Sequence, residues 1–182
     1  MSNPYTGSVA SALRKCQLLL SAAAEGEVAA VPPSHPAALV HAATLEGALL
    51  QLWRAYRAFL AEQAHQLSLG AEPESATALL KLAAASHKAS AEVGELVSLA
   101  ENPDSWFREL EQAWRALWRF AAQQGGARAS GSVSGPGAVQ NLIPSTQLAE
   151  APAGPLSVER LEGWHRKLSE LVARQRAQGQ EW

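Results

Sequence analysis

The sequence predicts an all-α fold, a bundle of four to five helices with a long irregular crossover before the last helix. Hydrophobic residues make up 47% of the 182 residues, and most of them are Ala and Leu, with Ile143 as the single isoleucine. Few β-branched residues and much Ala and Leu favour helix over strand. In addition, apolar residues recur at helical spacing in five segments, which sets the expected number of helices.

The central helix is predicted from Pro36 to Leu67, the longest run of helix formers in the chain, interrupted only by Gly47. At ~1.5 Å per residue such a helix is roughly 45 Å long. A helix of this length cannot bury its apolar stripe alone, so we expect the other helices to pack around it. The stripe keeps a spacing of three and four residues: Leu45, Leu49, Leu52, Trp53, Tyr56, Phe59 and Leu60.

Two further helices flank the central one in the sequence. The first is predicted from Tyr5 to Glu25, with Cys16 in the middle of its apolar face as a buried small hydrophobe. The other is predicted to begin near Glu72 and to end at Glu101. Its middle is built from small residues, which allow a break near Ser86 and the adjoining histidine.

The last two helices carry many of the aromatic residues. The fourth is predicted from Asp104 to about Gln124, and the fifth from Ser157 to Gln178 with Ser157 as its N-cap. An aromatic stripe at helical spacing is more often core than a cofactor site. We therefore expect four aromatic side chains in mid-stripe positions to form one core: Trp53, Tyr56, Trp114 and Trp164.

The whole chain, residues 1–182, is expected to form one helical-bundle domain. Residues 1–124 hold the first four helices, and residues 125–155 form a flexible linker rich in Gly, Ser and Pro. Residues 156–182 hold the C-terminal helix, which is expected to pack back on the bundle because its stripe is too apolar for water. The competing interpretation places this helix on a second chain, in a swapped dimer.

The charge balance argues against some classes of partner. The chain has 15 Lys and Arg residues against 17 Asp and Glu residues, and a net charge of −2 gives no electrostatic reason to expect nucleic acid or an anionic membrane. No apolar run reaches the ~20 residues that span a bilayer, and the N-terminus lacks the features of a signal peptide. A single cysteine, Cys16, suits a reducing compartment, so we expect a cytoplasmic protein.

Four short stretches carry a resemblance to a known family: NPYTG near the start, RAYRAFLAE in the central helix, NPDSW before the fourth helix and QRAQGQEW at the end. With these stretches the chain resembles a family of small helical proteins from Pseudomonas-like gammaproteobacteria, a domain of unknown function. The resemblance covers nearly the whole chain apart from the linker. It implies a bacterial, cytoplasmic, all-helical protein and no activity to carry over.

Two Glu-x-x-His pairs are candidate metal ligands: Glu62 with His65, and Glu162 with His165. Ferritin-like bundles build a di-iron site from two such pairs and two further glutamates, all projecting inward. The end of the central helix and the start of the last helix can meet in such a bundle. However, Glu62 is expected roughly 120° and His65 roughly 180° from the centre of the apolar stripe. We interpret these residues as solvated surface, and expect neither a metal site nor another cofactor.

Arg160 and His165 are the candidate catalytic residues of an alternative interpretation. Their Arg-x4-His spacing resembles that of HEPN ribonucleases, which are also helical bundles, and this resemblance implies a pair that acts on the RNA 2′-hydroxyl. The chain departs from the pattern at Leu161, where those enzymes usually carry a polar residue. The two candidate residues also flank opposite sides of the apolar face.

The sequence as a whole favours a non-enzymatic protein-interaction or structural role, with an unknown protein partner or a homo-oligomer. The alternative is a HEPN-like ribonuclease or RNA-binding bundle that uses Arg160 and His165. A basic concave surface around these two residues would favour the enzyme. An exposed apolar groove lined by Trp118, Leu148 or Trp182 would favour the interaction role.

Overall fold

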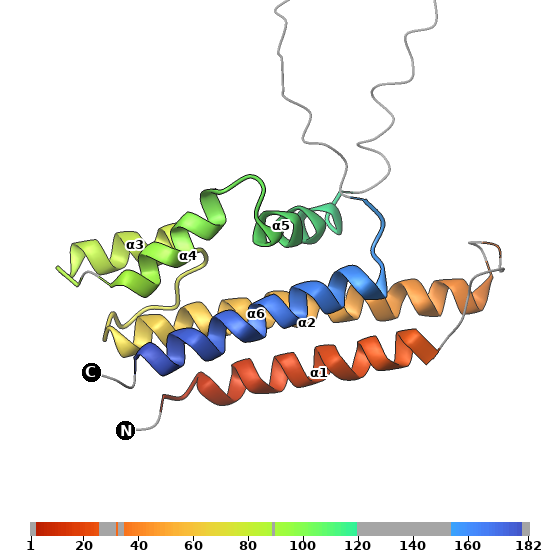
Figure 1. Ribbon diagram of the computed structural model, residues 1–182, viewed down its shortest axis with the longest axis horizontal. Coiled ribbons are helices and arrows are strands. Elements are labelled where there is room, and N and C mark those ends of the chain that lie inside the picture. The colour runs from red at the N-terminus through yellow and green to blue at the C-terminus, as the bar shows by residue number, and fades with distance from the viewer. Residues whose placement is uncertain (1–2, 26–31, 33–34, 89, 120–153, 180–182) are drawn as a thin grey trace, which may run out of the picture.

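The computed structural model describes residues 3–25, 32, 35–88, 90–119 and 154–179, and these form six α-helices and no strand (Figure 1). The all-α prediction is confirmed for this part of the chain, whereas the predicted number of four to five helices is too low. Most of the predicted linker, residues 125–155, lies outside the described residues. The helices are α1 (Thr6–Glu25), α2 (Pro36–Gln66), α3 (Ala76–Ala85), α4 (Ala91–Glu101), α5 (Trp106–Ala116) and α6 (Val158–Gln178).

Serine N-caps begin four of the helices. The hydroxyls of Ser75, Ser90, Ser105 and Ser157 each accept a hydrogen bond from the backbone N–H three residues further on, at the starts of α3, α4, α5 and α6. Each bond satisfies one of the N–H groups that have no partner within the first turn of a helix. The predicted N-cap of the last helix is therefore confirmed.

The helix predicted over residues 72–101 is two helices, α3 and α4. The backbone of His87 adopts a positive φ of 54°, which a continuing α-helix cannot accommodate. The N–H of Lys88 turns back to the carbonyl of Ala83, and Ser90 then caps the next helix. The small residues around Ser86 permit this turn, and the break divides the expected third helix.

The fourth predicted helix corresponds to α5, which ends at Ala116 and not near residue 124. The next three N–H groups, those of Leu117, Trp118 and Arg119, each bond to the carbonyl three residues back. This tighter pattern is typical of a chain leaving an α-helix. Residues 120–124 lie outside the described part, so the remainder of that prediction is not tested.

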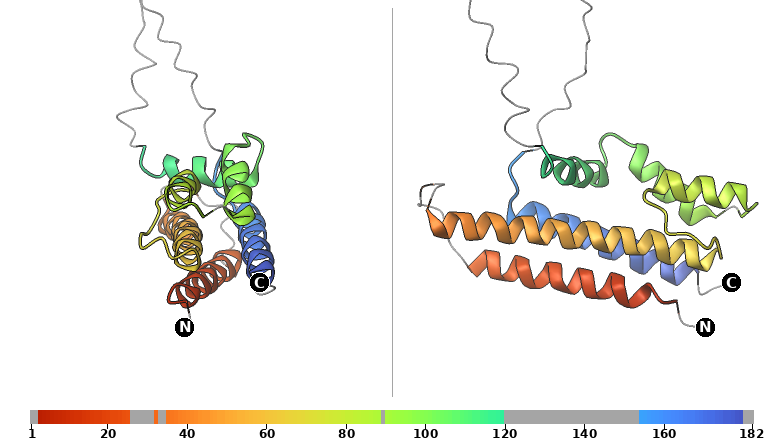
Figure 2. Two further views of the ribbon diagram at one scale, coloured as in Figure 1. Left: turned by 90° about the vertical axis from the view of Figure 1, so that its left-hand side faces the viewer. Right: turned by 180° about the vertical axis from the view of Figure 1, so that it is seen from behind.

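The helices lie in layers around α2 (Figures 1 and 2). The three long helices α1, α2 and α6 lie side by side, with α1 antiparallel to the other two and α6 parallel to α2. The shorter helices α3, α4 and α5 cover the opposite side, where α3 and α4 form a hairpin and α5 crosses α2 and α6. As a result α2 has neighbours on several faces.

The core follows the long helices. Cys16 is fully buried, as predicted for a small hydrophobe on the inner face of α1. Tyr56 and Trp164 are both buried in the core, while Trp53 is half-buried and packs against it. Trp114 lies further out than predicted, half-buried and stacked on Trp53 with ring centroids 5.3 Å apart. The apolar stripe of α6 is also buried: Leu161, Trp164, Leu168, Leu171 and Val172.

No helix in the described residues is long and apolar enough to cross a membrane. This finding agrees with the hydropathy of the sequence, in which charged residues interrupt every long helix.

Candidate functional site

Glu62 is not on the solvated surface where the sequence pattern placed it. Its side chain is 2% exposed, because α1 and α6 cover the face of α2 that the apolar stripe leaves open. The Arg176 guanidinium at the end of α6 forms a two-pronged ion pair with it, and the Thr6 hydroxyl donates a further hydrogen bond. The carboxylate is thus bound by other side chains of the same chain.

The four candidate metal ligands are spread over the molecule. Glu62 and His65 lie at the C-terminal end of α2, whereas Glu162 and His165 lie in the N-terminal half of α6. Because α2 and α6 are parallel, the two pairs lie toward opposite ends of the bundle, so the end of α2 does not meet the start of α6, although the sequence allowed it. Glu62 faces Arg176, which is about 21 Å along α6 from Glu162 at ~1.5 Å per residue.

His65 and Glu162 are exposed, as expected for helix surface. The His65 ring packs against the Tyr5 ring, with centroids 6.1 Å apart. Among the residues that the structure describes, no three His, Cys, Asp or Glu side chains gather in a way that could hold a metal ion.

Arg160 and His165 both make contacts within the bundle. The Arg160 guanidinium donates hydrogen bonds to the carbonyls of Gly154 and Pro155, both at 2.9 Å, and lies over the Trp164 ring at 5.0 Å. The His165 Nε2 atom is 3.1 Å from the carbonyl of Leu13 on α1, to which it donates. These contacts give both side chains a structural role in holding α6.

An apolar groove lies between α2 and the end of α5, and we call it the α2–α5 groove. Its volume is about 580 Å³, within the range of pockets that hold ligand groups. Trp118 and Leu50 stand on its walls with 59% and 40% of their surface exposed. The remaining lining is small or apolar, with one acid and one base at the rim: Ala43, Glu46, Gly47, Trp114, Ala116, Leu117 and Arg119.

An exposed apolar stripe leads from the groove along the N-terminal half of α2, which extends beyond α6 (Figure 1). Val40, Ala43, Gly47 and Leu50 follow a spacing of three, four and three residues, so they form a second stripe on α2. This stripe lies roughly opposite the buried residues of the same helix. Val40 is 67% exposed, and over residues 36–50 the helix carries a single charged residue.

The predicted apolar groove lined by Trp118 corresponds to this site in part. Trp118 does line it, whereas Leu148 and Trp182 lie outside the described residues. Sequence reasoning missed Gly47 and Leu50. The sequence does contain a signal for these two groove residues. Residues 36–50 of α2 carry a single charged residue and are apolar on two faces of the helix.

A family model described as "Family of unknown function (DUF6586)" matches residues 9–182. No curated protein and no solved structure matches the chain.

Proposed function

The chain belongs to the family of unknown function DUF6586, and from its geometry we propose that it is a non-enzymatic interaction protein whose α2–α5 groove binds an amphipathic helix of a partner protein. The observation that carries this proposal is the groove itself. Two large apolar side chains, Trp118 and Leu50, are exposed in a groove that is also lined by the small residues Ala43 and Gly47. Contiguous exposed apolar surface of this kind is typical of a binding site.

The spacing of the second stripe favours a helix as the ligand. Along about three turns of α2, two larger side chains, Val40 and Leu50, flank the small residues Ala43 and Gly47. Side chains of a second helix can enter the spaces left by Ala43 and Gly47, as ridges enter grooves in ordinary helix packing. Recognition of an amphipathic helix in an apolar groove is a recurrent mode of peptide binding.

The size of the surface favours a single helix over a second copy of the chain. From residue 40 to residue 50 the stripe is about 15 Å long at ~1.5 Å per residue, close to the footprint of a few helical turns. A stable pair of proteins normally buries about 800 Å² on each partner. The groove and stripe are too short for such a flat interface, but they suit the side chains of one inserted helix.

The charge at the rim indicates the flank of the partner helix. Glu46 is exposed beside the groove, and it forms no ion pair within the described part of the chain. A lysine or arginine next to the apolar face of the partner helix would complement it. The main effect of this charge pair would be to fix the orientation of the bound helix, and its contribution to the affinity would be small.

A bacterial, cytoplasmic setting belongs to this proposal. It is supported by the single cysteine, which suits a reducing compartment, and by the resemblance drawn from the sequence motifs. Nucleic acid is not expected as the partner, because the net charge is −2 and the basic residues have no overall excess.

A photo-crosslinking amino acid at position 50 tests the proposal in cells that express the chain. The matched control places the same group at Leu18, which is 54% exposed on α1 and does not line the α2–α5 groove. Adducts are digested, and the attached segment is identified by mass spectrometry. We expect position 50 alone to capture a segment with an apolar helical face and a basic flank.

A synthetic peptide of the captured segment then provides the quantitative test. We expect it to gain helical circular dichroism on binding and to shift the fluorescence of Trp118. Leu50→Glu should weaken binding by at least about tenfold, because it places a charge in the apolar groove, while Leu18→Glu should leave binding unchanged. Equal capture from both positions, capture of a second copy of the chain, no adduct, or equal binding to both variants would each refute the proposal.

A further inference from the structure

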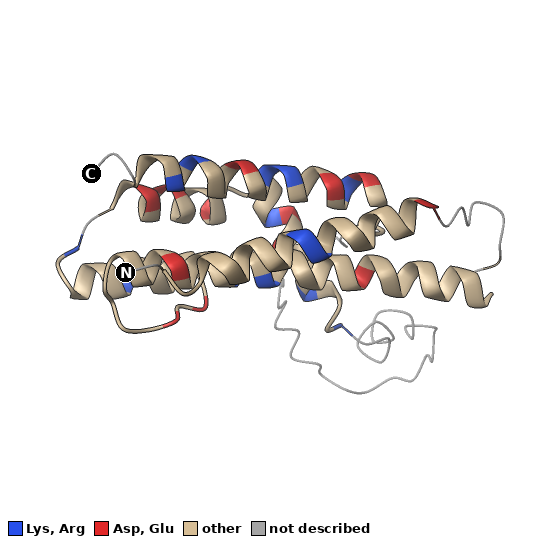
Figure 3. Ribbon diagram, turned by 90° about the horizontal axis from the view of Figure 1, so that it is seen from below, with Lys and Arg blue, Asp and Glu red and all other residues tan. Residues whose placement is uncertain are grey.

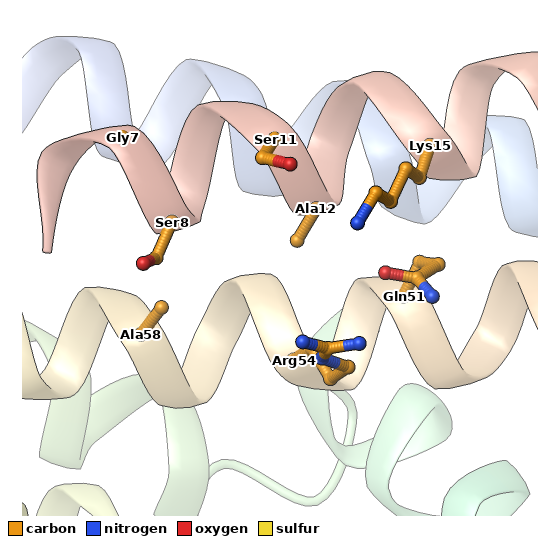
Figure 4. A pocket seen from close by; sticks show the side chains of 8 residues that line it. All are labelled: Gly7, Ser8, Ser11, Ala12, Lys15, Gln51, Arg54 and Ala58. Atoms are coloured by element: carbon orange, nitrogen blue, oxygen red, sulfur yellow. The ribbon is translucent and has the colours of Figure 1, made fainter.

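A second groove, polar and smaller, lies between α1 and α2, and we call it the α1–α2 groove (Figure 4). Two cationic side chains enter it from opposite sides, Lys15 from α1 and Arg54 from α2. Ser8 and Ser11 contribute hydroxyls, and Gln51 contributes a side-chain amide. The remaining lining residues are glycine and alanine, whose small side chains leave space between the two helices. The groove has a volume of about 250 Å³.

The two cationic groups are not balanced by any acid that the structure describes. Within the described residues, neither the Lys15 ammonium nor the Arg54 guanidinium makes an ion pair or a hydrogen bond. The two segments that form the groove, residues 6–24 and 47–61, contain four Lys or Arg residues and no Asp or Glu. Seen from below, the ribbon of α1 is coloured for basic residues only in the middle of the helix (Figure 3). The α1–α2 groove is therefore locally positive, although the net charge of the whole chain is −2.

Gln51 adds a hydrogen-bond acceptor that has no partner. Its Oε1 atom is buried from solvent and accepts no hydrogen bond in the structure, and Figure 4 shows the amide pointing into the groove. A buried acceptor without a donor costs free energy, so a ligand that carries an O–H group would stabilise it. The groove thus offers cationic and hydroxyl donors on two sides and one acceptor between them.

We propose that the α1–α2 groove binds a phosphate-type anion that retains an O–H donor, either the hydrogen phosphate dianion or the monoanion of a phosphomonoester. Lys15 and Arg54 neutralise the charge, the serine hydroxyls donate to the oxygens, and Gln51 Oε1 accepts from the O–H group. The volume of about 250 Å³ lies below the range of pockets that hold drug-sized ligands, so it suits the phosphate group itself.

Titration of the full chain with inorganic phosphate, followed through backbone amide NMR shifts of Gly7, Ser8 and Ser11, tests the proposal. We expect a millimolar dissociation constant, in keeping with two exposed cations. Lys15→Gln and Arg54→Gln should each weaken binding about five- to tenfold through loss of a charge-assisted hydrogen bond. Both side chains are exposed, so these variants should stay folded.

Arg14→Gln is the matched control. It removes the same charge one residue away on α1, from an exposed side chain that does not line the groove. We expect it to change the affinity less than twofold. A loss as large as that of Lys15→Gln would show general attraction to a basic surface and would refute a site, as would the absence of saturable shifts.

Sulfate separates the role of Gln51 from that of the cations. Sulfate has the charge and shape of the phosphate dianion but no O–H group, so at alkaline pH it should bind more weakly than phosphate. Gln51→Met should remove this preference and leave sulfate binding unchanged. Equal affinity for the two anions in the unmodified chain would overturn the assigned O–H donor.

Two sources of the phosphate group are distinguished by a vesicle assay. Flotation at about pH 6 with phosphatidylcholine vesicles that contain phosphatidic acid presents a phosphomonoester on a lipid under conditions in which it keeps part of its O–H groups. Binding that requires Lys15 and Arg54, but not Arg14, would assign the site to a lipid headgroup. Saturable binding of free phosphate without flotation would assign it to a soluble ligand, and failure in both assays would overturn the proposal.

Discussion

The Arg176 guanidinium donates two hydrogen bonds to the Glu62 carboxylate, at 2.8 Å from Nε to Oε1 and at 2.7 Å from Nη2 to Oε2. The carboxylate is 2% exposed, and Asn3 donates a hydrogen bond to the Glu62 carbonyl at 3.0 Å. This arrangement joins the end of α2 to the end of α6 and to the segment that precedes α1. A charged group is therefore buried where three parts of the chain meet.

Arg176→Met should lower the free energy of unfolding by about 3 kcal/mol, because it leaves a buried carboxylate without its counter-ion. Replacing both residues, with Glu62→Met and Arg176→Met together, should recover most of that loss. Arg174→Met is the control, since Arg174 pairs with Glu95 at an exposed position of the same helix and should cost less than about 1 kcal/mol. Urea unfolding measures all three, and equal losses in the two single variants would contradict the assigned role.

The two tryptophans Trp164 and Trp114 should differ in their contribution to stability. Trp164 is 3% exposed and its indole N–H donates to Glu109 at 3.3 Å, so Trp164→Ala should cost about 3–5 kcal/mol. Trp114 is half-buried and loses chiefly its stacking on Trp53, so Trp114→Ala should cost only about 1–2 kcal/mol. Thermal and denaturant unfolding decide the order, and a reversed order would mean that α5 packs more tightly than α6.

The thiol of Cys16 should be inert in the folded protein. Burial raises its pKa to about 12 from an ordinary value of 9.0, so the reactive thiolate is scarce near neutral pH. We expect Ellman's reagent to label Cys16 in denaturant and to label the native chain only at the rate of unfolding. Fast labelling under native conditions would show that α1 opens locally.

The same shift predicts a dependence of stability on pH. The folded thiol stays protonated above pH 9, where the unfolded thiol begins to ionise and the unfolded state binds fewer protons. The contribution of Cys16 is thus complete below the unfolded pKa and is lost as the pH rises toward about 12. Cys16→Ala should show a smaller decline over this interval in unfolding experiments, and an identical decline would contradict the assignment.

Two glycines should respond in opposite ways to replacement by alanine. A Cβ added at Gly163, in the middle of α6, meets no atom within 4 Å, so Gly163→Ala should raise stability by about 0.5–1 kcal/mol. Gly70 has a φ of +66°, in the left-handed region, so Gly70→Ala should lower stability by about 1 kcal/mol. Differential scanning calorimetry measures both changes in stability. If both substitutions changed the stability in the same direction, the difference in backbone conformation between the two glycines would not be the cause.

The long helices were predictable because their apolar stripes and start signals agree. α1, α2 and α6 begin and end within two residues of the predicted positions, since Pro36 and Ser157 mark the starts of two of them. The break at His87 was indicated only by small residues nearby. It depends on a left-handed backbone turn at that histidine, which residue spacing does not reveal.

Glu62 was misplaced because one stripe was taken as the only buried face of α2. Over residues 59–64 this helix is buried on all sides, since it lies at the centre of the bundle. The partner of Glu62 also depends on α6 running parallel to α2, and the spacing within a helix does not give its direction. The grooves were hard to foresee for a related reason: they are defined by alanine, glycine and serine, which fit buried and exposed positions alike.

The contact between His165 and Leu13 joins residues 152 positions apart in the chain. During synthesis on the ribosome, α1 and α2 emerge before α6 and can form a hairpin. The helix α6, which covers their apolar faces, is synthesised only after roughly another hundred residues. Throughout that interval the apolar faces of α1 and α2 must stay in water or be held by a chaperone. Folding of this core thus waits for the synthesis of α6, and it should be sensitive to premature termination within that helix.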